Sequence, residues 1–185
     1  MDELTEQLRD IRWRASELLD GLTSEQLLRR PDPAKWSIAE CLAHLNQTAA
    51  VLQPLMDSAI KSGRKQNCIG EGPFKPGVLG RFLRWLAEPP PKIRLRAPKN
   101  ILPPTSITDP AAVVAEFTRC QDEWERLGRE SSGLDQQKLK IPSPFTGLSG
   151  LRLCAILPWM MAHERRHLLQ AEKVKQQIQA KAARA

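Results

Sequence analysis

Residues 36–45 read Trp36-Ser37-Ile38-Ala39-Glu40-Cys41-Leu42-Ala43-His44-Leu45 and mark the start of a helix. Ser37 and Glu40 are spaced as a capping box, in which each side chain accepts a hydrogen bond from the other residue's backbone N–H. Trp36 and Cys41 are spaced as the hydrophobic staple that often accompanies such a start. Apolar residues then recur every three or four positions as far as Met56, which is the period of one helix face. The stretch therefore predicts a long amphipathic helix.

Three further helices are predicted by the same period, over about residues 3–21, 109–128 and 149–179. No hairpin signal and no alternating sheet pattern is found in the chain. Four helices with one long crossover between the second and the third predict an all-α four-helix bundle. We expect a single domain over residues 1–179, followed by a frayed basic tail at residues 180–185.

The crossover covers residues 63–108 and is rich in proline and glycine. A connection this long is uncommon in a compact domain unless it crosses the fold or carries function. Its pattern predicts one short helix, from about Gly77 to Ala87. Residues 92–96 alternate like a strand, but no partner strand is predicted for them.

The net charge of +7 is concentrated in this crossover. Between Lys75 and Lys99 there are seven basic residues and one acid, Glu88, so the segment alone carries +6. Nucleic acid is not an expected partner, because no nucleic-acid motif accompanies the charge and aromatic residues are sparse. Two interpretations remain for residues 75–99: a rim that binds an anionic substrate, or a solvated loop.

The chain shows no targeting or membrane signal. It has no run of about 18 apolar residues that could cross a bilayer, and its acidic N-terminus lacks the hydrophobic region of a signal peptide. None of the four cysteines forms a CxxC pair, which favours reduced thiols over a disulfide framework. These features predict a cytoplasmic protein without a membrane partner.

Three histidines, His44, His163 and His167, form a candidate metal site. Residues four positions apart share a helix face with Cβ atoms about 6 Å apart, which suits two imidazoles binding one ion at about 2.0–2.1 Å. His44 lies on another helix that could bring it opposite the pair. Three protein ligands leave a coordination position open, as in catalytic metal sites. The alternative is histidines at the solvent edge of a bundle, bonded to neighbouring groups.

Residues 163–167 also fit the H-E-x-x-H pattern of zinc proteases, with Glu164 as the general base. Eighteen residues follow His167 and contain one acid, Glu172, which leaves no room for the usual distant third ligand. An all-helical chain also lacks the edge strand on which a protease aligns a peptide. The pattern therefore does not indicate a protease.

The two histidine-bearing segments resemble one family. Residues 36–45 are similar to the W-S-x-x-E-x-L-x-H-L signature of DinB-like proteins, and residues 144–149 with 163–170 resemble that family's last helix. The resemblance implies a four-helix bundle in which His44, His163 and His167 hold a divalent metal, most often nickel or zinc. It also implies hydrolase activity or thiol transfer with a low-molecular-weight thiol, and a possible homodimer.

The resulting hypothesis is Lewis-acid chemistry on a small-molecule substrate, by hydrolysis or thiol transfer. Glu164 is the candidate proton carrier, since it is the acid nearest to the ligands in sequence. Gln170 and Glu40 are candidates for orienting the ligands, although the capping box already accounts for Glu40. The alternatives are a metal-binding protein without turnover, and a structural or interaction bundle without metal.

Overall fold

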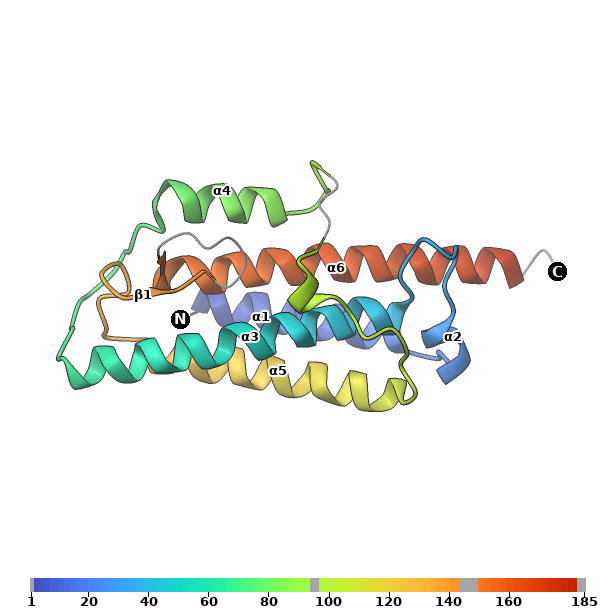
Figure 1. The fold of residues 1–185 in the computed structure, drawn as a ribbon, viewed down its shortest axis with the longest axis horizontal. Helices are drawn as coiled ribbons and strands as arrows, with labels where there is room; N and C mark the ends of the chain where they lie inside the picture. The colour runs from blue at the N-terminus through green and yellow to red at the C-terminus, as the bar shows by residue number, and fades with distance from the viewer. Residues whose placement is uncertain (1, 94–96, 144–149, 183–185) are drawn as a thin grey trace.

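Four long helices lie side by side in the computed structural model, which describes residues 2–93, 97–143 and 150–182 (Figure 1). They are α1 (Asp2–Leu19), α3 (Ile38–Lys65), α5 (Pro110–Glu130) and α6 (Leu153–Ala182). The short helix α2 (Ser24–Leu28) joins α1 to α3 at one end of the bundle. The predicted all-α four-helix bundle is confirmed.

The core lies between the four helices, because each of them turns an apolar stripe inward. Helix α3 packs against α5 and α6, and α1 packs against the same two helices. Trp124 of α5 and Leu42 of α3 are completely buried at these contacts. No helix in the described part of the chain is long and apolar enough to cross a membrane.

The start of α3 follows the capping box predicted from the sequence. The Ser37 hydroxyl accepts a hydrogen bond from the Glu40 backbone N–H at 3.1 Å, and the Glu40 carboxylate accepts one from the Ser37 N–H at 2.8 Å. Asp109 caps α5 in a similar way, accepting from the Ala112 N–H at 3.0 Å. These side chains satisfy backbone donors that have no partner in the first helical turn.

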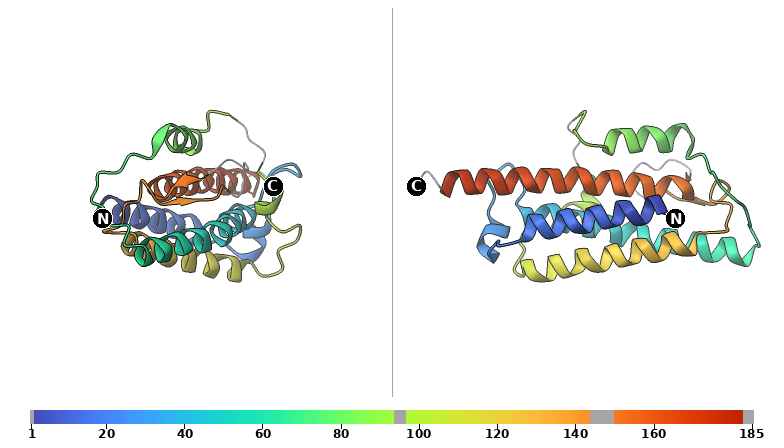
Figure 2. Two further views of the ribbon diagram at one scale, coloured as in Figure 1. Left: turned by 60° about the vertical axis from the view of Figure 1, so that its left-hand side comes forward. Right: turned by 180° about the vertical axis from the view of Figure 1, so that it is seen from behind.

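The crossover contains the helix predicted for it. Helix α4 (Gly77–Ala87) has the expected bounds and lies on the outer side of α6 (Figure 2). A 3-10 turn, η1 (Lys99–Ile101), follows and contacts α3. Of residues 92–96, which alternate like a strand, residues 92 and 93 form a bend and residues 94–96 lie outside the described part.

Two short strands precede α6 and were missed by the sequence analysis. Strands β1 (Lys140–Ile141) and β2 (Leu151–Arg152) pair antiparallel. Helix α6 consequently begins at Leu153 rather than near Ser149, the predicted start. Residues 144–149 lie outside the described residues. Strands of two residues are too short to produce an alternating pattern.

The C-terminal end of α6 also differs from the predicted boundary at residue 179. The helix continues to Ala182, so the first three residues of the predicted tail at 180–185 are helical. Residues 183–185 lie outside the described part of the chain.

We expect Ser37→Ala to lower the free energy of unfolding by about 1 kcal/mol, because it leaves a buried N–H of the first turn of α3 without an acceptor. Chemical denaturation measures the change. Ser58→Ala, at an exposed position of the same helix, is the matched control and should cause no loss. Equal effects from the two substitutions would contradict the capping role.

Candidate metal centre

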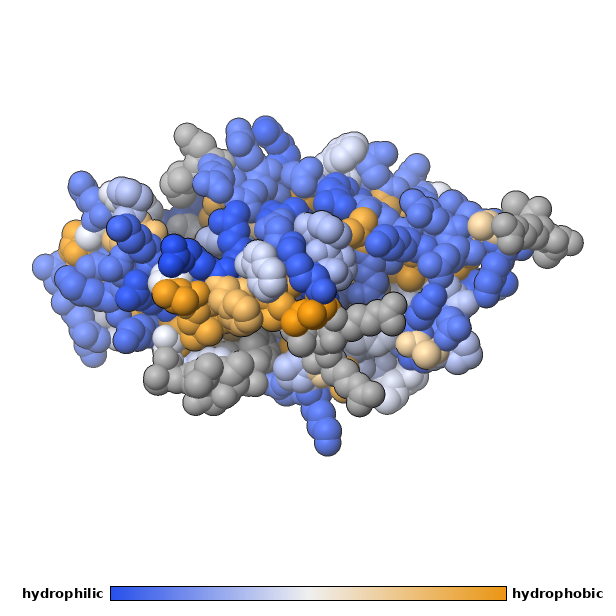
Figure 3. Space-filling view, turned by 90° about the horizontal axis from the view of Figure 1, so that it is seen from above, coloured by the Kyte–Doolittle hydropathy of each residue, from blue (hydrophilic) through white to orange (hydrophobic). Residues whose placement is uncertain are grey.

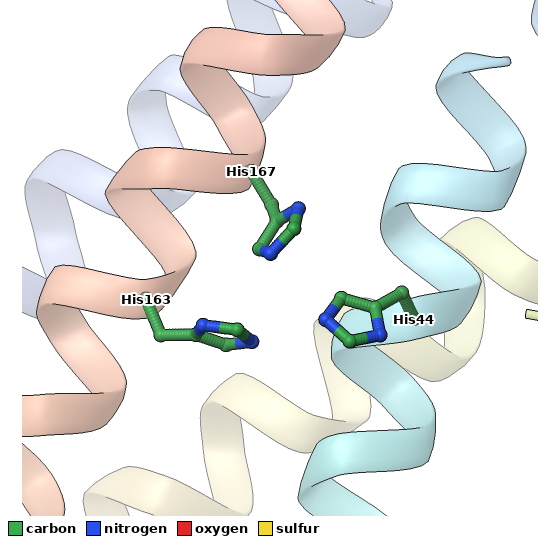
Figure 4. A group of neighbouring side chains, drawn as sticks. All are labelled: His44, His163 and His167. Atoms are coloured by element: carbon green, nitrogen blue, oxygen red, sulfur yellow. The ribbon is translucent and has the colours of Figure 1, made fainter. Parts of the chain in front are cut away.

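The three histidines meet between α3 and α6. His163 and His167 project from successive turns of α6 toward His44 on α3 (Figure 4). One ligand atom from each ring can be chosen so that all three atoms lie within 4.8 Å of one another. Ring centroids are 4.5 Å apart for His44 and His167, 4.6 Å for the α6 pair, and 5.2 Å for His44 and His163. The structure thus brings together the residues that the spacing singled out.

Burial leaves two imidazole nitrogens of this cluster without partners. His44 and His167 are buried, and His163 is partly exposed. Nε2 of His163 and Nδ1 of His167 are nevertheless buried atoms that make no hydrogen bond within the described residues. An unsatisfied buried polar group costs about 1–3 kcal/mol. A bound metal ion would remove that cost, so the donor set fits a metal.

The backbone of the crossover fixes the tautomer of His44. Nδ1 of His44 lies 2.6 Å from the carbonyl oxygen of Ile101. A carbonyl can only accept, so Nδ1 must carry the proton and Nε2 is left as the ligand atom. Ile101 could not be identified from the sequence, because a backbone carbonyl leaves no signature in the residue type.

Burial also holds the three rings in the neutral form. Desolvation lowers the pKa of His163 to about 3 and lowers the pKa of His167 as well. It lowers the pKa of His44, although the bond to Ile101 partly offsets the effect. The neutral imidazole is the form that binds metal.

Two tryptophans form aromatic walls of the cluster. Trp36 lies 5.0 Å from His44 and stacks on His167 at 5.9 Å, and Trp159 stacks on His163 at 5.2 Å, measured between ring centroids. From the sequence, Trp36 is expected in a hydrophobic staple and in the DinB-like signature, but not beside the histidines. Its position just before α3, which carries His44, was the available signal for this second role.

Glu164, the candidate proton carrier, points toward α5. One oxygen of its carboxylate accepts a hydrogen bond from the Gln121 amide at 3.0 Å, and the other lies buried without a partner among the described residues. The side chain is 1% exposed, and desolvation raises its pKa to about 7. One residue along a helix is a turn of about 100°, which separates Glu164 from the ligand face of α6.

The two candidates for orienting the ligands differ in their surroundings. The Gln170 side chain lies one turn beyond His167 and interacts with its ring. Glu40 instead holds the start of α3 and forms an ion pair with Arg30. Burial alone would raise the pKa of Glu40, but hydrogen bonds to Arg30 and Ser37 lower it overall. Of the two candidates, Gln170 is therefore the one that interacts with a histidine ring.

The two arginines between the α6 histidines tie the crossover to α6. Arg165 forms two hydrogen bonds with the Glu88 carboxylate, at 2.8 and 2.9 Å. Arg166 donates to the carbonyls of Leu86 and Ile93, both at 2.8 Å. Both arginines are partly buried, and they hold the segment after α4 over α6.

Comparison with known proteins agrees with the four-helix fold. Residues 7–171 match the sequence profile of the DinB superfamily. The fold is similar to that of YfiT from Bacillus subtilis, described as a probable metal-dependent hydrolase with an unusual four-helix bundle topology. The TM-score is 0.61 at 14% identity, over 96% of this chain and 87% of that one. No curated protein matches the chain.

We expect Glu164→Gln to change the pH dependence of stability in the metal-free protein. The folded state keeps the proton between pH 4.5, the ordinary pKa of glutamate, and about 7, so this carboxyl favours folding below pH 4.5 and loses that contribution as the pH rises through 7. Glutamine does not titrate. The free energy of unfolding of the variant, relative to the native chain, should therefore rise by about 2–3 kcal/mol from pH 4.5 to 8.

Urea denaturation at a series of pH values measures this difference. Glu17→Gln, at an exposed position on α1, is the matched control. A difference between Glu164→Gln and the native chain that does not change with pH would show that the buried carboxyl is not protonated in the folded state.

Proposed function

Because the chain belongs to the DinB superfamily, we propose that it is a metal-dependent enzyme of the hydrolase class that acts on a small-molecule substrate. The observation that carries this proposal is the set of buried imidazole nitrogens without partners at the meeting of α3 and α6. YfiT, which shares the fold, is described as a probable metal-dependent hydrolase, and this supports the choice of reaction class.

His44, His163 and His167 would hold the ion. A ligand set made only of imidazoles suits zinc or nickel better than magnesium or calcium, which prefer oxygen. Such an ion, when bound, supplies Lewis acidity and lowers the pKa of a water molecule. Three protein ligands are the usual number in catalytic zinc sites, which keep one further position for water or substrate.

The surrounding residues would prepare the ligands for this role. The Ile101 carbonyl presents the correct nitrogen of His44, and Gln170 steadies His167. Trp36 and Trp159 cover the rings with apolar surface, which keeps water away and strengthens electrostatic interactions at the ligands. Glu164 could move a proton only through its unpartnered oxygen, because Gln121 occupies the other one.

We expect the protein, prepared without a histidine tag and reconstituted with Zn²⁺ or Ni²⁺, to hold about one ion per chain. His163→Ala removes one of three ligands and should weaken metal binding by at least about tenfold. Metal analysis after dialysis and a competition titration measure both quantities. Glu164→Gln is the matched control, since it changes the neighbouring residue without removing a ligand. Full metal retention by His163→Ala would contradict the ligand assignment.

We expect the metal-loaded protein to hydrolyse at least one member of a panel of small esters, amides and phosphoesters, and His163→Ala to be inactive. Repeating the panel with added low-molecular-weight thiols tests thiol transfer. Glu164→Gln that retains metal but loses activity would support proton transfer by Glu164. Tight metal binding with uniform inactivity would instead favour a metal-binding protein without turnover.

A further inference from the structure

Helix α4 packs inward with Gly80, Leu83 and Ala87 and leaves several large apolar residues outside. A Cβ atom at Gly80 would lie 2.7 Å from the Cβ of Ala155 on α6. Val78, Phe82 and Trp85 face solvent, with 76%, 52% and 52% of their surface exposed. An amphipathic helix that only packed on α6 would not leave so many large apolar side chains on its solvent face.

The exposed face of α4 forms the main apolar patch seen from above the molecule (Figure 3). Of the nine large hydrophobic side chains that are exposed in the described residues, five lie between positions 78 and 93. The rings of Phe82 and Trp85 stack at 5.9 Å, which makes the patch continuous along the helix. A continuous apolar patch on a surface that faces solvent marks an interaction site.

Basic side chains border the apolar patch. A hollow of about 380 Å³ beside Trp85 is lined by Arg81, Arg84, Glu88 and Lys92 as well as by Trp85 itself. The Lys92 ammonium lies 5.8 Å from the centre of the Trp85 ring. The one acid of the hollow, Glu88, is paired with Arg165 at 2.8 Å and more loosely with Arg84 at 3.9 Å. The hollow is therefore suited to an anionic group held next to apolar surface.

We propose that the exposed face of α4 docks the protein on an anionic lipid surface. Phe82 and Trp85 enter the boundary between headgroups and acyl chains, while Arg81, Arg84 and Lys92 contact lipid phosphates. The aliphatic stems of these basic residues can lie along the apolar surface with their charges at the headgroups. This contact is peripheral and requires no spanning helix, in keeping with the absence of such a helix from the described residues.

Charge and size favour this occupant over a second copy of the chain. A two-fold contact through α4 would bring Arg81 and Arg84 of both copies together, and like charges facing each other in an interface are unfavourable. An 11-residue helix is also small for a stable dimer, which buries about 800 Å² on each partner. Nucleic acid could use the basic residues and stack on Phe82 and Trp85, but it would leave the exposed aliphatic side chains of Val78 and Leu79 in contact with water.

The acidic side chains nearby set the orientation of docking. A second hollow, on the other side of Arg84, is lined by Glu3, Glu6 and Asp10 of α1 together with residues of α4 and α6. An anionic surface repels these carboxylates. The molecule therefore docks with the side that carries Lys92 toward the lipid and with α1 turned away from it.

Co-sedimentation with vesicles tests the proposal in the full chain. We expect binding to vesicles of phosphatidylcholine with phosphatidylglycerol, little binding to phosphatidylcholine alone, and weaker binding as salt rises. The double variant Phe82→Gln with Trp85→Gln should bind at least tenfold more weakly. The double variant Arg81→Gln with Arg84→Gln should lose about tenfold or more, since each basic residue near such a surface contributes roughly fivefold.

Exposed residues elsewhere on the molecule provide the matched controls. Trp13→Gln removes another exposed tryptophan, on α1, and Arg29→Gln with Lys35→Gln removes two exposed charges beyond α2. Neither control should change vesicle binding. Equal losses in the controls and the α4 variants, or equal binding to neutral vesicles, would overturn the proposal.

Two further outcomes would also overturn it. In one outcome, the native chain does not bind vesicles and sedimentation velocity shows a dimer, which the Phe82 and Trp85 substitutions convert to a monomer. The other is binding to single-stranded oligonucleotides that exceeds binding to anionic vesicles. Metal content is measured in the same variants, and it should be unchanged, so failure here is separate from failure of the metal-site proposal.

Discussion

The rest of the structure depends on how three buried imidazoles satisfy their nitrogens. Each ring that leaves water loses hydrogen bonds on both sides, and a helical bundle offers few backbone groups to replace them, since its own N–H and C=O groups are paired within helices. His44 obtains one bond from outside the helices, at Ile101. The α6 pair retains nitrogens without a protein partner. A core that accepts this cost is consistent with a group that binds at these nitrogens.

The same helical period that brings the histidines together separates them from Glu164. Positions four apart share a face of α6, so His163 and His167 meet His44, while the residue between them in the motif turns toward α5 and meets Gln121. The local sequence fits the pattern of a zinc protease, but the third histidine comes from α3, whereas Glu164 meets α5. The chemistry of a motif therefore depends on which neighbouring helix each face meets.

The sequence predicted what local rules determine. The capping box at Ser37, the bounds of α4 and the face shared by His163 and His167 follow from hydrogen bonding and periodicity within one segment. The missed contacts join segments far apart in the chain and use atoms that residue type does not reveal. They include the carbonyl that holds His44, the ties from Arg166, and the two-residue strands before α6. Only the resemblance of two distant segments to one family predicted that α3 and α6 would be neighbours.

The crossover explains why one segment carries most of the net charge and yet belongs to the fold. Its carbonyl at Ile101 fixes the tautomer of His44, and its carbonyls at Leu86 and Ile93 receive the guanidinium of Arg166 between the two α6 histidines. Helix α4, in the same segment, presents large apolar side chains to solvent. One stretch of chain therefore contacts His44 and Arg166 on its inner side and forms part of the outer surface of the molecule on its other side. Its basic residues consequently serve a segment that is packed on α6 by side-chain bonds to its backbone, rather than a loop surrounded by solvent.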